Sequence, residues 1–83
     1  MYTVGIVLRD CSESERTRFD MARNGIMYQF ANVIDDNWVK VNGRLQLQMA
    51  GTILSDKHLA VVLEYIATVP EYVVSVNIAE EGN

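Results

Sequence analysis

The sequence predicts one small α+β domain in which two helices cover one face of a four-stranded antiparallel sheet. Segments with the periodicity of strands and segments with the periodicity of helices follow each other in the order β-α-β-β-α-β. An Asn42-Gly43 pair lies between two alternating segments, as in a tight hairpin. The chain has 83 residues, of which 49% are hydrophobic, and this fits a single domain, 1–83, with one core.

The first strand is predicted at Tyr2–Arg9. Val4, Ile6 and Val7 place apolar side chains on both of its faces, which is typical of a central strand. Gly5 within the strand indicates close packing by a helix or by another backbone.

The segment from Ser12 to Ile34 allows three interpretations. Ser12-Glu13-Ser14-Glu15 fits a capping box at the start of a helix. The apolar face that follows has helical spacing and consists of Phe19, Ala22, Ile26, Phe30, Val33 and Ile34. Gly25 in its middle costs a helix about 1 kcal/mol relative to alanine. The segment therefore forms one long or kinked helix, a helix that ends at Asn24 before a strand at 26–34, or a hairpin turning at Asn24-Gly25.

The polar triplet Asp35-Asp36-Asn37 is predicted to be an exposed connection that leads into the hairpin. The hairpin strands are Trp38–Val41 and Arg44–Met49, and its register stays open. A two-residue turn places Trp38 opposite Leu47 on the core face, whereas a three-residue loop turns Trp38 outward.

The last third of the chain predicts a helix and then a strand. Ser55 caps a helix at Asp56–Thr68, and Pro70 ends it. The apolar stripe of this helix consists of Leu59, Val62, Leu63 and Ile66. The strand covers 72–78 and is followed by an acidic, frayed tail at 79–83. We expect Leu47, Leu63 and Val76 to be buried together.

This element order resembles the ferredoxin-like fold, a β-α-β-β-α-β sandwich with an antiparallel sheet and two helices on one face. The alternative is a β-rich meander with one helix, Ser55 to Thr68, packed on the sheet. The ferredoxin-like group includes acylphosphatases, RNA-recognition modules and amino-acid-sensing domains. Their defining residue patterns do not occur in this chain, so the resemblance concerns the fold and not the function.

The residue types that usually carry chemistry are scattered. Cys11 has no basic neighbour in the sequence that would lower its pKa, and His58 falls in the first turn of a helix, where we expect it at the surface. These positions indicate no catalytic set, no metal site and no cofactor, so we expect a protein that is not an enzyme. The single cysteine indicates a reducing, cytoplasmic location. The pI of about 4.7 disfavours direct binding to nucleic acid and to anionic membrane surfaces.

The sequence favours a noncatalytic protein-interaction module, an inhibitory or regulatory accessory protein that docks on a basic, nucleic-acid-handling partner. The expected partner-binding residues are the acidic pairs Asp35-Asp36 and Glu80-Glu81. A small positive spot, open to an anion or to a partner's acidic loop, is expected at Arg9, Lys40 and Arg44. The alternative function is a small-ligand-sensing regulatory domain, and a homodimer stays an open alternative.

Overall fold

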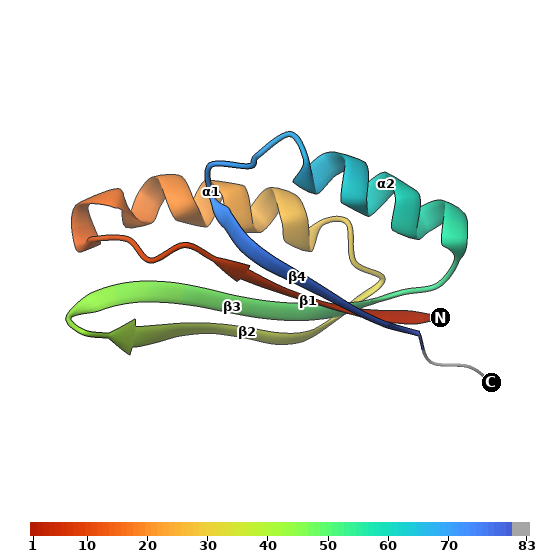
Figure 1. The fold of residues 1–83 in the computed structure, drawn as a ribbon, viewed down its shortest axis with the longest axis horizontal. Helices are drawn as coiled ribbons and strands as arrows, with labels where there is room; N and C mark the ends of the chain where they lie inside the picture. The colour runs from red at the N-terminus through yellow and green to blue at the C-terminus, as the bar shows by residue number, and fades with distance from the viewer. Residues whose placement is uncertain (81–83) are drawn as a thin grey trace.

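The computed structural model describes residues 1–80 and forms two layers, a sheet and a pair of helices on one of its faces (Figure 1). The elements are β1 (Tyr2–Leu8), a 3-10 turn (Glu13–Glu15), α1 (Arg16–Met27), β2 (Asn32–Val41), β3 (Arg44–Ile53), α2 (Asp56–Ile66) and β4 (Val73–Glu80). The sheet has the order β2-β3-β1-β4, and every neighbouring pair is antiparallel. The predicted ferredoxin-like arrangement is confirmed, with β1 and β3 central and with β2 and β4 at the edges.

The ambiguous segment is a helix followed by a strand, but Gly25 does not end the helix. α1 continues to Met27 and β2 begins at Asn32, so one helix to Ile34 and a hairpin are both wrong. The glycine is explained by the second helix. A Cβ atom at Gly25 would lie only 1.8 Å from the hydroxyl oxygen of Tyr65 in α2. Absence of a side chain therefore lets the two helices approach each other, which compensates for the low helix propensity of glycine.

The expected connection at 35–37 is also wrong, because these residues lie inside β2. β2 pairs along nearly the whole of β3, from Asn32 opposite Thr52 to Val41 opposite Arg44. β2 therefore includes residues 35–37, because it extends along nearly the full length of β3. The register shifts between Val33 and Asp35, so that Ile34 is the extra residue of a bulge.

The hairpin has the two-residue turn of the first interpretation. Asn42 has φ of 51° and Gly43 has φ of 78°, the left-handed values that a tight hairpin of this kind requires. Trp38 consequently lies opposite Leu47 on the face of the sheet that the helices cover. Arg16 of α1 lies over the Trp38 ring, with its guanidinium carbon 5.2 Å from the ring centroid.

The core lies between the sheet and the helices. It includes the alternate residues Val4, Ile6 and Leu8 of β1, together with side chains from β3, α1 and α2: Leu45, Leu47, Met49, Ile53, Phe19, Ile26, Val62 and Ile66. The ring of Phe30, in the α1–β2 connection, covers Gly51 of β3, where a Cβ atom would lie 2.2 Å from the Phe30 Cγ. This contact explains a buried glycine in a central strand.

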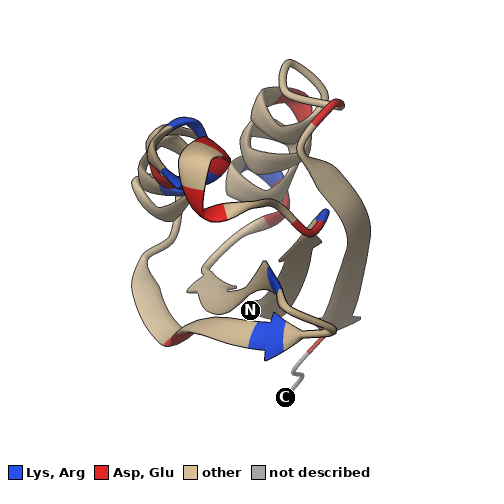
Figure 2. Ribbon diagram, turned by 90° about the vertical axis from the view of Figure 1, so that its left-hand side faces the viewer, with Lys and Arg blue, Asp and Glu red and all other residues tan. Residues whose placement is uncertain are grey.

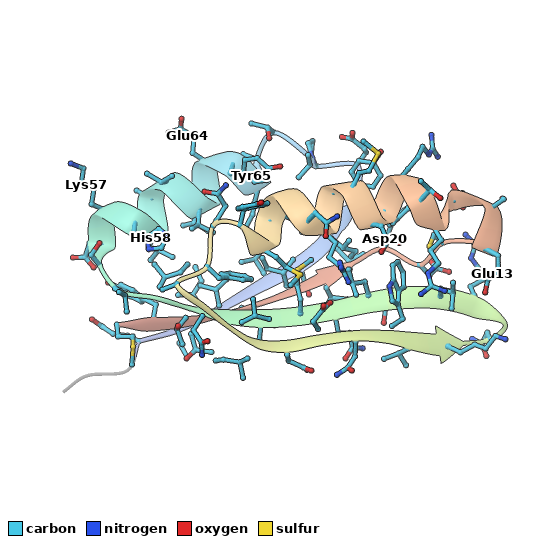
Figure 3. All side chains as sticks on the ribbon, turned by 180° about the vertical axis from the view of Figure 1, so that it is seen from behind. Glu13, Asp20, Lys57, His58, Glu64 and Tyr65 are labelled. Atoms are coloured by element: carbon cyan, nitrogen blue, oxygen red, sulfur yellow. The ribbon has the colours of Figure 1, made fainter. Side chains whose placement is uncertain are left out.

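The expected burial of Leu47, Leu63 and Val76 together is only partly correct. Val76 is partly buried and packs against the core that includes Leu47, whereas Leu63 is 37% exposed and is not part of that core. The reason is the rotation of α2, which turns Tyr65 toward α1 (Figure 3). Residues two positions apart on a helix point in nearly opposite directions, and Leu63 is thereby turned away from α1.

Gly5 is not a close-packing position either, because no atom lies within 4 Å of its would-be Cβ. It points to the face of the sheet that no helix covers. The neighbours on this open face are uncharged side chains of β1, β3 and β4: Thr3, Val7, Gln46, Gln48, Ala50, Thr52, Ser75, Asn77 and Ala79. Within residues 1–80, no helix is long and apolar enough to span a membrane.

Candidate functional site

The expected positive spot proves to be a set of ion pairs that holds the β1–α1 connection. Arg44 Nε donates to Asp10 Oδ2 at 2.7 Å, and Arg44 also lies 3.8 Å from Glu15. Arg9 approaches the same Glu15 carboxylate at 3.9 Å and donates through Nε to the backbone oxygen of Glu71 at 2.8 Å. Arg9 and Arg44 therefore lie together, as predicted, but carboxylates of this chain already neutralise them.

Lys40 is not part of this set. It lies opposite Leu45, whose side chain is buried, and so belongs to the helix-covered face of β2. No ion pair is formed by Lys40 within residues 1–80. The three basic residues therefore do not form one anion-binding spot.

Glu15 organises the connection. Its carboxylate accepts from the backbone N–H of Ser12 at 3.1 Å and from the Ser12 hydroxyl at 3.2 Å. These hydrogen bonds, and then the nearby Arg9 and Arg18, hold the pKa of Glu15 below its ordinary value. The capping residues that the sequence predicted thus support the start of α1 through a 3-10 turn. Backbone hydrogen bonds between Cys11 and Leu45, at 2.7 and 2.8 Å, join the same connection to β3.

The acidic pair Asp35-Asp36 is divided between the two faces of the sheet, because neighbouring residues of a strand point in opposite directions. Asp36 lies on the helix-covered side, where its Oδ2 is 3.2 Å from Arg23 Nη1 of α1. Asp35 Oδ1 accepts from the backbone N–H of Asp36 at 3.0 Å and from the side chain of Asn37. The pair is therefore not the free acidic loop that the sequence suggested, and Asp36 serves to attach α1 to β2.

Glu80, the last described residue of the expected acidic set, lies at the end of β4 opposite Tyr2. Glu81 lies outside the described residues. The Tyr2 hydroxyl donates to Asp56 at the start of α2. This hydrogen bond, followed by burial and by the charges of Asp56 and Glu80, raises the pKa of Tyr2 to about 12. The structure therefore places both Glu80 and Asp56 near Tyr2, and Asp56 is a residue that sequence reasoning did not select.

The distribution of charge along the chain was also missed. Residues 1–53 contain six basic and six acidic side chains, whereas residues 54–83 contain one basic and five acidic side chains. The whole net charge of −4 therefore belongs to the second segment, which contains α2 and β4. A count of charges by segment would have shown this from the sequence.

The fold places this acidic segment on one side of the molecule. In Figure 2 both colours are mixed on α1, whereas α2 stands beside β4 with a red and a blue segment and the turn between them carries a red segment. Glu64 points away from the sheet (Figure 3), Glu71 is exposed in the turn and Glu80 is exposed at the end of β4. We call α2, this turn and β4 the acidic side.

The surroundings of Cys11 and His58 indicate structural roles for both side chains. Cys11 is fully buried, and burial followed by the charge of Glu15 raises the pKa of its thiol, which disfavours a reactive thiolate. His58 is partly buried rather than at the surface, and its Nε2 contacts the backbone oxygen of Gln29. The ring thus links α2 to the connection that follows α1. The His58 backbone N–H donates to the hydroxyl of the predicted cap Ser55 at 3.1 Å.

Within residues 1–80, no three His, Cys, Asp or Glu residues are grouped so that they could hold a metal ion.

A shallow groove of about 420 Å³ lies between the two helices. Its lining is mostly apolar and aromatic with one basic residue: Arg18, Met21, Ala22, Tyr65, Val69 and Tyr72. Its size falls in the range of small-molecule sites, although the groove is open to solvent.

The fold and these surfaces define a small ferredoxin-like α+β domain. Comparison with protein-family models gives no match, and comparison with curated proteins gives none either. Among solved structures, the chain is similar to the de novo designed protein Foldit4, with a TM-score of 0.72 and 15% identity over 98% of both chains. It is also similar to a structural-genomics target from Agrobacterium tumefaciens, with a TM-score of 0.56 and 5% identity over 95% of this chain and 89% of that one. At these identities the similarity concerns the fold alone.

Proposed function

We propose that the protein is a noncatalytic protein-interaction module that docks its acidic side on a basic surface of a partner, such as a protein that handles nucleic acid. The observation that carries this proposal is the segregation of charge. Four basic residues outside the acidic side are used within the chain, in ion pairs with Asp10, Glu15 and Asp36: Arg9, Arg18, Arg23 and Arg44. The net charge of −4 belongs to the segment that contains α2 and β4.

Long-range electrostatic attraction makes such a surface effective. Charges within a Debye length of about 10 Å reinforce one another at moderate salt, and clustered charges accelerate association with an oppositely charged partner. Glu64 and Glu71 are exposed, so a basic partner can meet them without a large desolvation cost. A balanced, internally paired surface such as that of α1 lacks this advantage.

The test is capture of partners from the native host, followed by measurement of association rates. The double variant Glu64→Lys/Glu71→Lys reverses the acidic side. Glu13→Lys/Asp35→Lys makes the same charge change away from the acidic side as a matched control, since these two carboxylates also form no ion pair within residues 1–80. We expect a basic protein that is captured by the wild type and the control, is lost with the first variant and is released by salt. Equal capture by both variants, or an association rate that does not depend on salt, would contradict the proposal.

The groove between the helices supports the second candidate, a small-ligand-sensing regulatory domain. Its aromatic and aliphatic lining suits an apolar molecule. Arg18 uses one nitrogen for Glu15, but its side chain is 64% exposed and has donors left for a carboxylate on that molecule. Titration with phenylacetate, monitored by the amide resonances of α1 and α2, tests it. Binding that the variant Arg18→Met abolishes is the expected result, and unchanged spectra would exclude this ligand class.

A further inference from the structure

The two edges of the sheet differ in how they are protected against pairing with another strand. Edge strands expose unpaired backbone groups, and natural proteins protect them with bulges, inward-pointing charges and lysine. β2 has all three, namely the irregularity after Val33 and the residues Asp36 and Lys40 on its helix-covered face. The β2 edge is therefore closed to added strands.

The β4 edge has little of this protection. β4 pairs on one side only, with β1, and the seven residues Val73–Ala79 include no charged residue and no proline. β4 has one bulge, at Val74, because Ser75 lies opposite Val7 and Val73 lies opposite Leu8, and Ser75–Glu80 remain in regular pairing. Val74 is 61% exposed and Ile78 is 45% exposed. A regular, uncharged and partly apolar edge is thus available along most of the strand.

An apolar side chain extends this edge toward the helix layer. Ile78 lies opposite Val4, which is fully buried, so Ile78 is on the helix-covered face. Side chains of a strand added beside β4 would meet Ile78 on this face.

Acidic residues stand at both ends of the edge. Glu71 precedes β4 and Glu80 ends it, while Asp56 lies near Glu80 through their common neighbour Tyr2. The uncharged stretch between them spans about 23 Å at the usual rise per residue of a strand. A segment that fits here is extended, apolar in the middle and basic at both ends.

We propose that β4 accepts such a segment of a partner protein as a fifth strand, so that main-chain hydrogen bonds supply affinity and the acidic residues at both ends select lysine or arginine. This inference rests on the proposed function and specifies how the basic partner binds. A second copy of this chain fits less well. Antiparallel pairing of two β4 strands about Val76 would place Glu80 of each copy beside Tyr72 and Glu71 of the other, and like charges across a strand pair are destabilising.

The experiment uses two synthetic peptides of about ten residues, a length that covers the edge. Both have alternating valine and threonine in the middle, and one has lysines at both ends where the other has glutamates. Titration into the full chain is monitored by amide resonances and by hydrogen exchange of β4. We expect the lysine peptide to shift and protect the amides of Ser75–Ala79, and to bind about tenfold more tightly than the glutamate peptide at low salt.

The variants compare the two edges. Ile78→Lys on β4 and Ile34→Lys on β2 make the same change at two exposed isoleucines, which are 45% and 55% exposed. We expect Ile78→Lys to weaken binding of the lysine peptide about tenfold and Ile34→Lys to leave it within about twofold. If Ile78→Lys does not fold, as judged by its thermal transition, Val74→Lys at the same edge replaces it with the same expectation.

Three outcomes would overturn strand addition. The first is a lysine peptide that binds Glu64 and α2 but leaves β4 unchanged; the proposed acidic docking would then stand while its mode would be wrong. The second is no binding of either peptide. The proposed function would then still be tested separately, by capture of a basic partner from the native host. The third is protection of β4 that depends on protein concentration in the absence of peptide, which would identify a second copy as the occupant.

Discussion

Substitution of Gly51 by alanine tests the packing of the core most directly. A Cβ atom at this position would lie 2.2, 2.4 and 2.7 Å from the Cγ and the two Cδ atoms of the Phe30 ring. These atoms form the base of a buried ring and cannot move aside without moving the α1–β2 connection. Overpacking of this kind costs about 1–3 kcal/mol. The lower entropy of the unfolded chain returns about 0.4–1 kcal/mol.

The net expectation for Gly51→Ala is a loss of about 1.3 kcal/mol in the free energy of unfolding. For a domain of this size, that lowers Tm by about 5–10 °C. The matched control is Gly5→Ala, in the strand next to Gly51, where no atom lies within 4 Å of the new methyl group. The control should be neutral or slightly stabilising. Thermal and urea unfolding of both variants supply the measurement.

A double-mutant cycle shows whether Phe30 is the cause. Phe30→Leu removes the ring atoms that oppose the new methyl group, so Gly51→Ala should cost much less in that background. We expect a favourable coupling of about 1 kcal/mol between the two changes. Additive effects, or equal Tm values for Gly51→Ala and Gly5→Ala, would refute the close contact between Phe30 and β3.

Three further predictions concern the helix layer and its ion pairs. Gly25→Ala should lower Tm although alanine favours helices, because the methyl group meets the hydroxyl of Tyr65, and Tyr65→Phe in the same chain should restore part of the loss. Asp36→Asn should reduce the free energy of unfolding by about 1–2 kcal/mol in urea, because Arg23 loses the nearer of its two carboxylate partners, at 3.2 Å, and keeps only Asp20 at 4.0 Å. Asp35→Asn, which removes no ion pair formed within residues 1–80, should have little effect. Since the folded pKa of Glu15 lies below its ordinary value, its contribution is present above that ordinary pKa and is lost as pH falls through the folded value. Acid unfolding followed by circular dichroism should therefore be less steep in Glu15→Gln than in the wild type.

The order of elements and the hairpin could be predicted because they depend on local patterns. Asn42-Gly43 supplies two left-handed residues in succession, and alternation from Leu45 to Met49 identifies the core face. The boundary between α1 and β2 could not be predicted from the sequence, because it depends on tertiary contacts. Gly25 alone indicates the end of a helix, and only the contact with Tyr65 explains why the helix continues. Asp35-Asp36 alone indicates a loop, and only pairing with β3 explains why these residues form a strand.

The same reasoning explains which site residues were misjudged. A sequence shows that Arg9 and Arg44 are basic, but only the fold brings Asp10 and Glu15 against them. Their charges are consumed in joining β1, α1 and β3, so they are poor candidates for binding an anion. The acidity of the segment after Ile53, in contrast, could have been counted from the sequence, because it has a single basic residue to pair with.

This difference between paired and unpaired charge changes how the docking hypothesis must be tested. Reversal of Asp35 and Asp36 to lysine removes the partner of Arg23 and places a second cation beside it, so the change lowers stability whether or not a partner binds there. Weaker binding of that variant would then report partial unfolding rather than a lost contact. Reversal of Glu64 and Glu71 disturbs no ion pair formed within residues 1–80, since neither side chain takes part in one. A loss of binding without a change in Tm is therefore interpretable on the acidic side and not on β2, and the choice of residues determines whether electrostatic docking can be separated from folding.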